Sequence, residues 1–259
     1  MTIDMNGKTL VLSGGSKGIG KAIIYKFAEA GADIAFTYNS SEEVSQQIIA
    51  ELTEKYSVKV KAYKLDILEP NNYKDLFKTI DEDFDRVDYF ISNAIISGRP
   101  VVGGFSPFMR LKPKGMTNVY TATVLAFIVG AQEAAKRMEK VGGGAIVSLS
   151  STGNIVHTEN YTGHGSSKAA VETVVKYAAL ELAPMNIRVN ALSGGPIETD
   201  ALRAFPNFDD MKEKVIERTP LGRMGQSEDL AAPALFLCSD ASAWITGQTI
   251  IADGGSSFT

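Results

Sequence analysis

Hydrophobic residues occur along this chain in short, nearly continuous runs that alternate with longer stretches in which they recur every three or four positions. The first run, TLVLS at Thr9–Ser13, is followed by glycines, and apolar residues then appear at helical spacing until Gly31. Short apolar runs are typical of buried strands, and spacings of three and four are typical of helices. The opening of the chain is therefore predicted to fold as a strand at Thr9–Ser13, a glycine turn and a helix over residues 19–30.

The same alternation continues along most of the chain. It predicts further strands at residues 33–37, 58–65, 87–92, 145–150 and 188–192, and helices up to about residue 56, at about 70–82, from about 115 to 140, and across Lys168 until Pro184. Ser40 and Glu43 have the spacing of a capping box, which would begin the second helix. Strands that alternate with helices of this length imply parallel βαβ units, and almost continuously apolar strands imply a sheet with helices on both faces. We expect an α/β fold, a Rossmann-type doubly wound parallel sheet in which residues 1–259 form a single domain.

Two stretches interrupt the alternation, at residues 97–115 and 200–219. The first contains three prolines and four glycines, and the second is rich in phenylalanine and charge. Both follow the ends of predicted strands, where open α/β sheets bind their ligands. We expect both to be substrate-side loops and the second to be a mobile lid, although simple surface loops are the alternative.

The composition argues against several classes of function. With 259 residues, 44% of them hydrophobic and 22% charged, the chain can bury a full core. The net charge of −4 and the pI near 5.4 give no basic surface for nucleic acid or an anionic membrane. The single cysteine, Cys238, has no disulfide partner, and the sequence has neither a secretory leader pattern nor a run of about 18 apolar residues. We expect a cytoplasmic protein that acts on small molecules and binds neither nucleic acid nor membranes.

The glycines after the first strand are spaced as in a phosphate-binding turn. Gly14, Gly18 and Gly20 stand between a predicted strand and a predicted helix, so the backbone could approach a pyrophosphate at the helix N-terminus. A tight turn that merely needs small residues is the alternative, but the position at the first strand-to-helix turn of a βαβ unit favours a nucleotide site. The expected cofactor contacts in this turn are Gly14, Ser16, Lys17, Gly18, Ile19 and Gly20.

The end of the second predicted strand indicates which dinucleotide binds. An acidic residue there would hold a ribose 2′-hydroxyl, but the sequence reads Thr37-Tyr38-Asn39-Ser40. With no acidic side chain at this position, nothing there would repel a 2′-phosphate, and Lys17 could attract it. A merely solvated lysine is the competing interpretation. We therefore predict NADP(H) rather than NAD(H) as the cofactor, with Asn39 and Ser40 among its contacts.

A phenol, an imidazole and an ammonium occur together in residues 160–168. His164 and Lys168 are neighbours at i, i+4 on a helix, whereas Tyr161 precedes Lys168 by seven positions and should lie at or just before the first helical turn. A lysine ammonium near a phenol lowers the pKa of the tyrosine, which makes it a usable proton donor. An ordinary helix with a polar N-terminus is the alternative. His157 and His164 are the only histidines and lack metal-ligand spacing, so no metal site is expected.

Together these motifs resemble the short-chain dehydrogenase/reductase family over nearly the whole chain. The residues that carry the resemblance, in the family's order, are Ser13-Gly-x-x-x-Gly-x-Gly20, Asp66-Ile67, Ser92-Asn93-Ala94, Ser150-Ser151, Lys168 and Gly195-Pro196-Ile197-Glu198-Thr199. The resemblance implies that Asp66 and Ile67 border the adenine and that Asn93 and Ala94 lie along the adenosine ribose. It implies that Lys168 bonds the nicotinamide ribose. The remaining implied cofactor contacts, the last two at the nicotinamide end, are Gly195, Pro196, Ile197 and Thr199.

The position of the tyrosine matches one branch of this family. Ordinary members place it four residues before the lysine, where this chain has His164, whereas the six-residue gap between Tyr161 and Lys168 resembles the enoyl-acyl-carrier-protein reductases. Residues 131–144, 159–161 and 189–207 look closest to the type III, FabL-like group. Two positions depart from the family pattern. Thr123 stands where many members carry a catalytic asparagine, and Ile95 stands where a glycine usually follows Asn-Ala.

Conjugate reduction gives a physical reason for the shifted tyrosine. The hydride lands two bonds further from the oxygen than in ketone reduction, roughly 2.5 Å on ordinary bond lengths, so the proton donor must stand further from the nicotinamide. The resemblance therefore implies an NADPH-dependent enoyl-thioester reductase in which Tyr161 hydrogen-bonds or protonates the enolate oxygen and Lys168 holds the ribose. Ser151 would be a second donor at the carbonyl, or merely a polar residue at a strand end. The expected substrate contacts are Ile95, His164 and Phe205.

Two other interpretations stay open on sequence alone. The chain could act on a ketone, aldehyde or alcohol, with His164 as proton donor and Tyr161 structural, or it could be a non-catalytic NADP-binding sensor. Retention of both Tyr161 and Lys168 argues against the sensor. The resemblance implies an acyl thioester as substrate, with acyl carrier protein as a candidate carrier, and a homo-oligomer, a tetramer, as the assembly. Phe205 and Phe208 of the second loop would then meet the acyl chain.

Overall fold

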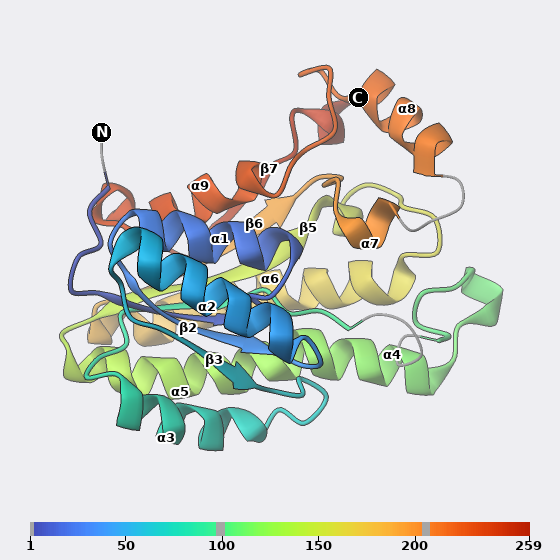
Figure 1. Cartoon of the computed structure of the whole chain (residues 1–259). Helices are drawn as coiled ribbons and strands as arrows, with labels where there is room; N and C mark the ends of the chain where they lie inside the picture. Colours follow the sequence, from blue (N-terminus) through green and yellow to red (C-terminus); the bar gives the residue numbers. More distant parts are fainter. Residues whose placement is uncertain (1–2, 97–101, 204–207) are drawn as a thin grey trace.

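Seven parallel strands form one sheet that runs through the molecule (Figure 1). The computed structural model describes residues 3–96, 102–203 and 208–259. The strands are β1 Thr9–Ser13, β2 Asp33–Tyr38, β3 Val60–Lys64, β4 Tyr89–Ser92, β5 Gly144–Ser151, β6 Ile187–Gly194 and β7 Thr249–Ala252. They pair in the order β3-β2-β1-β4-β5-β6-β7, and every pair is parallel. This order, which reverses between β1 and β4, confirms the predicted Rossmann-type doubly wound sheet.

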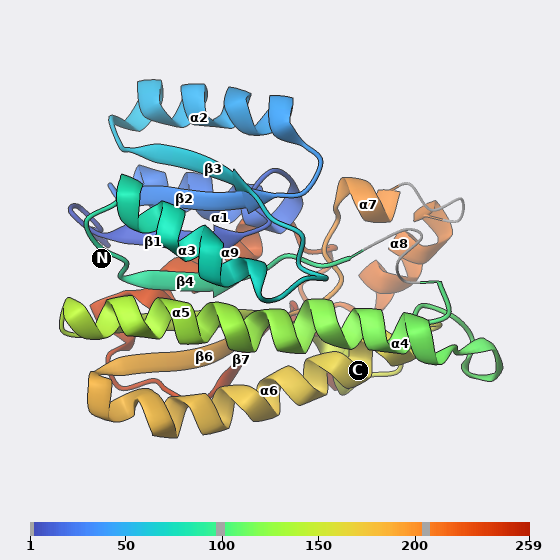
Figure 2. The same ribbon diagram turned by 90° about the horizontal axis from the view of Figure 1, so that it is seen from below.

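Helices cover both faces of the sheet, as the apolar strands predicted. They are α1 Gly18–Glu29, α2 Glu42–Tyr56, α3 Asn72–Asp83, α4 Pro113–Tyr120, α5 Ala126–Lys140, α6 Thr162–Leu182, α7 Asp200–Arg203, α8 Phe208–Arg218 and α9 Glu228–Cys238. The helices α1, α2 and α9 lie on one side of the sheet and α3, α5 and α6 on the other (Figures 1 and 2). Side chains of the first group form one core with the sheet, and side chains of the second group form the other. Within the described ranges, no helix combines the length and apolarity needed to cross a bilayer.

Side chains alternate along each strand between these two cores. In β1, Leu10 and Leu12 pack in the core beneath α1, whereas Val11 packs in the opposite core, and all three are almost completely buried. A slip of one residue in strand pairing would turn each of them to the wrong face. The register of the sheet is therefore fixed, and so are the strand ends that carry the polar motifs.

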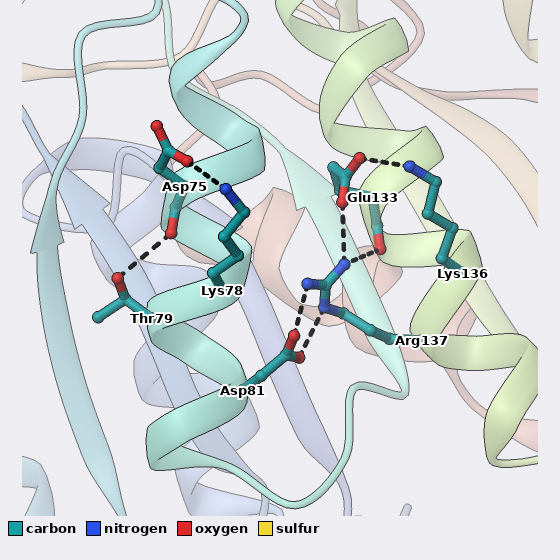
Figure 3. A network of polar contacts seen from close by, with 7 residues as sticks. All are labelled: Asp75, Lys78, Thr79, Asp81, Glu133, Lys136 and Arg137. Atoms are coloured by element: carbon teal, nitrogen blue, oxygen red, sulfur yellow. Dashed lines mark hydrogen bonds and ion pairs between the residues drawn. The ribbon is translucent and has the colours of Figure 1, made fainter.

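Ion pairs tie α3 to α5 on the face that also carries α6 (Figure 3). Arg137 donates two parallel hydrogen bonds to the Asp81 carboxylate, at 2.7 and 2.6 Å, and two more to Glu133 of its own helix. The guanidinium also lies 4.9 Å from the centre of the Phe77 ring. A bidentate, mostly buried arginine of this kind holds geometry better than an exposed pair does. It fixes α5 against α3 and hence the sheet.

The helices α4 and α5 form one continuous rod, joined by a π-helical turn at Thr121–Leu125 (Figure 2). The sequence predicted a single helix here, from about residue 115 to 140. Thr123, which stands where many family members have an asparagine, lies inside the π turn and is 6% exposed. Turns of this kind take up an extra residue and are frequent at functional sites. This departure from the family pattern therefore coincides with an irregularity of the helix.

The predicted capping box was wrong. The second helix begins at Glu42, with Ser41 as the N-cap residue, and no side chain caps it. The Ser45 hydroxyl bonds the Ser41 carbonyl instead. Because the helix starts after Ser41, Ser40 lies outside the first turn and cannot pair reciprocally with Glu43.

The stretch 200–219, predicted as a substrate-side loop and mobile lid, is largely helical in its described part, as α7 and α8, and its role as a lid stays a prediction. Asp209 and Asp210 in the first turn of α8 favour the helix. Glu198 forms ion pairs with Arg203 of α7 at 3.1 Å and with Lys212 of α8 at 3.0 Å. These pairs join both helices to the end of β6.

The sequence analysis assigned no element after residue 192. There the structure has α9, which contains Pro233 and buries the apolar run that ends at Cys238, and the edge strand β7, which has four residues. The proline inside the run weakens the sequence pattern expected of a helix at α9, and a short, half-buried edge strand such as β7 gives only a weak strand pattern.

Candidate active site

The glycine turn between β1 and α1 has the shape of a phosphate cradle. Gly14 and Gly18 have positive φ angles of 79° and 53°, and a Cβ on Gly20 would lie 1.9 Å from the carbonyl oxygen of Gly14. A residue with a side chain would adopt the positive φ angles, or fit so close to the Gly14 carbonyl, only with strain. The turn leaves the backbone at the start of α1 open to a ligand at the sheet's end, and the residues present therefore fit a dinucleotide pyrophosphate.

Asn93 fastens this turn to β4, at the point where the strand order reverses. Its side-chain amide donates to the carbonyl oxygens of Ser13 at 3.1 Å and Gly14 at 2.8 Å. The backbone N–H groups of Asn93 and Ala94 both donate to the Ser13 hydroxyl, at 3.0 and 3.1 Å. Asn93 therefore shapes the cradle from within the protein, and the contact of Asn93 and Ala94 with the adenosine ribose stays a prediction.

The residues predicted for the adenosine side lie after β1, β2 and β3, at one edge of the sheet. Lys17 is the exposed N-cap residue of α1, and Asn39 and Ser40 are exposed directly after β2. Asp66 is exposed after β3, where its carboxylate accepts the Leu68 N–H at 2.9 Å. The structure thus leaves the predicted 2′-phosphate contacts open to solvent. The same edge of the sheet also holds Ser16, Ile19 and the buried Ile67.

The segment after β6 returns to the glycine turn. A Cβ on Gly18 would lie 3.7 Å from the Thr199 methyl group, so the two predicted cofactor regions meet. Gly195 donates to the Ala252 carbonyl at 3.1 Å, and Ile197 pairs with Gly225 in an isolated bridge. These bonds hold the chain across Pro196 against β7 and leave Thr199 facing α1.

Tyr161 is the N-cap residue of α6, as its spacing from Lys168 predicted. The Ser151 side chain, at the end of β5, is the neighbouring group that lowers the pKa of the Tyr161 hydroxyl. The ring lies on the backbone of Gly153, where a Cβ would come within 2.6 Å of two ring carbons. The Gly153 N–H also donates to the Ser151 hydroxyl at 3.2 Å. The end of β5 and the start of α6 thus bring together two of the predicted catalytic residues.

Lys168 is buried, with 6% of its surface exposed, two helical turns beyond Tyr161. Its ammonium donates to the Leu149 carbonyl of β5 at 2.5 Å. Burial lowers the pKa of Lys168 to about 8, against a smaller opposing effect of the Glu172 carboxylate one turn further along. The Ser150 hydroxyl in turn donates to Glu172 at 2.5 Å. Lys168 is therefore fixed to the same strand that carries Ser151.

Three rings cluster at the start of α6. His164 stacks on Tyr161, with ring centres 5.3 Å apart and planes at 26°. Phe105 meets both rings edge-on, at 6.0 Å from Tyr161 and 5.9 Å from His164. Burial, aided by the charge of Lys168, lowers the pKa of His164 to about 4. The imidazole is therefore neutral near pH 7, which makes it a weak acid there.

The predicted effect of Lys168 on Tyr161 was wrong. Burial raises the pKa of Tyr161 above its ordinary value, and the influence that lowers it is the hydrogen bond with Ser151. The ammonium of Lys168 bonds the Leu149 carbonyl instead. Lys168 thus holds α6 to β5.

The sequence analysis missed two residues at this site, Phe105 and Gly153. The adjacent glycines at 103 and 104, in a stretch already expected to line the site, were the available signal for Phe105. Ile95, predicted to contact substrate, is 60% exposed just beyond β4. Phe205, the other predicted contact, lies outside the described residues, and the ring of Phe208 faces the Lys212 ammonium at 5.8 Å.

A phosphate cradle at the strand reversal, together with a half-buried tyrosine and a buried lysine at one helix, is the arrangement of an oxidoreductase that uses a nicotinamide cofactor. The sequence model of a family described as enoyl-(acyl carrier protein) reductase matches residues 14–257. The chain belongs to the short-chain dehydrogenase/reductase family, as the resemblance implied.

Relatives of known activity act on different bonds. The chain is 34% identical to 1-cyclohexenylcarbonyl-CoA reductase of Streptomyces collinus, over 95% of this chain and 85% of the relative. It is 31% identical to 3-oxoacyl-[acyl-carrier-protein] reductase FabG of Aquifex aeolicus, over 98% and 99%. A solved 7α-hydroxysteroid dehydrogenase in complex with NADH and 7-oxo glycochenodeoxycholic acid superposes with a TM-score of 0.89 at 32% identity, over 98% and 96% of the two chains.

Proposed function

We propose that this protein reduces the C=C bond of an enoyl thioester with NADPH, as an enoyl-acyl-carrier-protein reductase of fatty acid synthesis. The observation that carries the proposal is the difference between the surroundings of Tyr161 and those of His164. The phenol, at the start of α6, has the hydroxyl of Ser151, at the end of β5, as the neighbouring group that lowers its pKa. The imidazole, four residues before Lys168, is buried and neutral. Of the two candidate donors, Tyr161 is therefore the better placed and the better supported.

The site's own residues divide the work as follows. Tyr161 and Ser151 together hydrogen-bond the thioester oxygen and stabilise the negative charge that develops there, and Tyr161 then delivers a proton. Lys168 would hold the nicotinamide ribose, and the glycine turn the pyrophosphate, with Lys17, Asn39 and Ser40 on the 2′-phosphate. NADPH, when bound, supplies the hydride. His164, which stacks on the phenol ring, and Phe105, which meets it edge-on, shield part of that ring from water.

The test compares three substrates and two variants. NADPH oxidation is followed with crotonyl-CoA, a longer enoyl thioester and a β-ketoacyl thioester of matched length. We expect faster turnover of the enoyl substrates. Tyr161→Phe should lower kcat on them roughly 100-fold or more, the usual scale for losing a donor at a developing oxyanion. His164→Phe keeps the stacked ring and should cost much less. Faster consumption of the β-ketoacyl thioester, with His164 indispensable and Tyr161 dispensable, would refute the proposal.

Reduction of a carbonyl group is the second candidate function. It is favoured by the relatives that act on 3-oxoacyl and hydroxysteroid substrates, and the β-ketoacyl arm of the assay tests it. Delivery of the substrate by acyl carrier protein and assembly as a homotetramer complete the proposal. Turnover of crotonyl groups on acyl carrier protein tests the first, and light scattering at the assay concentration tests the second.

A further inference from the structure

Phe105 reaches the site from a separate part of the chain, in the connection between β4 and α4. Its ring stands almost perpendicular to that of Tyr161, at 87°, and at 68° to that of His164. Edge-to-face contacts of this kind have a preferred geometry, because the positive edge of one ring meets the negative face of another. Phe105 is therefore oriented by the ring pair that it touches.

The backbone beside Phe105 is docked on the helix that carries Tyr161. The Gly104 carbonyl accepts the N–H of Gly163, in the first turn of α6, at 3.2 Å. No side chain caps that helix, so Gly104 satisfies one of its otherwise unpaired N–H groups. The approach requires glycine, since a Cβ on Gly163 would lie 2.3 Å from the Gly104 oxygen, and one on Gly104 would lie 2.7 Å from the Gly115 oxygen.

A second bond sets the direction in which the chain leaves this contact. The Gly103 carbonyl accepts the Lys112 N–H at 2.8 Å, and Gly103 has a φ of 82°. Together with the bond from the Gly163 N–H to the Gly104 carbonyl, this bond leaves the backbone that leads to Phe105 little freedom. The ring is thus brought to the start of α6 by backbone contacts.

Tyr161 is consequently enclosed on three sides. His164 covers one face, the Gly153 backbone lies against the ring and Phe105 meets it edge-on. We infer that Phe105 is a positioning residue for the Tyr161 phenol, carried to it by the docking of Gly104 on the first turn of α6.

The inference deepens the proposed function, and its kinetic arm rests on that function. Phe105→Ala should lower kcat on the enoyl thioester roughly 10-fold, because a small displacement of a donor is costly, while the NADPH dissociation constant stays unchanged. Phe105→Leu, which restores bulk without an aromatic edge, should recover part of the loss. Phe258→Ala removes an 87% exposed ring elsewhere and should change nothing. An unchanged kcat in Phe105→Ala would overturn the inference, and so would an equal loss of NADPH affinity.

A second measurement needs no substrate. Protein labelled with 3-fluorotyrosine gives a fluorine signal for Tyr161, identified by its absence in Tyr161→Phe, and its shift between light and heavy water reports exposure of the ring. We expect that shift to rise in Phe105→Ala towards the value of a solvent-exposed tyrosine such as Tyr177, which is 66% exposed. Gly104→Ala should have the same effect although every ring is retained.

An unchanged fluorine shift in a folded Phe105→Ala protein would overturn the inference, whatever the substrate proves to be. A raised shift, in a protein that reduces the β-ketoacyl thioester and not the enoyl one, would refute the proposed function and leave the inference standing. Should Gly104→Ala fail to fold, Phe105→Ala decides alone.

Discussion

The buried imidazole of His164 should make the stability of this protein fall in mild acid. Burial lowers its pKa from 6.5 to about 4, so between these values the unfolded chain binds a proton that the folded chain does not. Stability is therefore highest above the unfolded pKa and is lost as the pH falls through 6.5 towards 4. The full gap corresponds to roughly 3 kcal/mol, and at pH 5 the loss is about 2 kcal/mol.

His164→Phe isolates this effect, because it keeps a ring between Phe105 and Tyr161 and removes the titration. The free energy of unfolding is measured by reversible urea denaturation at about pH 7.5 and pH 5, at one protein concentration. Between these conditions the unmodified protein should lose about 2 kcal/mol more than His164→Phe. His157→Gln, which removes the exposed histidine, should behave as the unmodified protein. Equal losses in the unmodified protein and His164→Phe would refute the reasoning, because His164 would then titrate alike in both states.

Three further outcomes follow from the site. Lys17→Ala should raise the KM for NADPH far more than that for NADH, and equal use of both cofactors by the unmodified protein would contradict the 2′-phosphate contact. Gly153→Ala places a methyl group 2.6 Å from ring carbons of Tyr161. It should lower kcat by roughly 10-fold to 100-fold, while circular dichroism shows an intact fold. Full activity of this variant would show that the Tyr161 ring can move without penalty. Because the pKa of Lys168 is about 8 and its ammonium form dominates below that value, kcat/KM should decline as the pH rises through about 8. Glu172→Gln should move this decline to lower pH, because the Glu172 carboxylate raises the pKa of Lys168. An unmoved pH profile would contradict that effect of Glu172.

The sheet could be predicted from sequence because its signals are local. Apart from β3, whose sequence is VKAYK, each strand from β1 to β6 is a short, largely apolar run. The glycines after β1 have a spacing that few other structures require. The place of Tyr161 at the start of α6 also followed from spacing, since seven residues make two helical turns. These inferences needed only the geometry of a helix and a strand.

The surroundings of the phenol could not be predicted in the same way. Contact between Phe105 and Tyr161 depends on the approach of two backbones that are far apart in sequence. The direction of the Lys168 ammonium depends on the Leu149 carbonyl, which no spacing rule identifies. The capping pattern of Ser40 and Glu43 likewise misled the prediction, because α2 starts only after Ser41.

The π turn at Thr121–Leu125 has a consequence for how proteins with this fold diversify. One residue added to a regular α-helix rotates everything beyond it by about 100°, which would turn the apolar side of α5 away from the sheet. A π turn absorbs the added residue where it occurs, so α5 keeps its contacts with α3 and β4 while α4 changes its phase. The rod therefore separates α5, which packs against α3 and β4, from α4, which packs against α6. A residue added to the helix before α5 then needs no compensating change in the sheet.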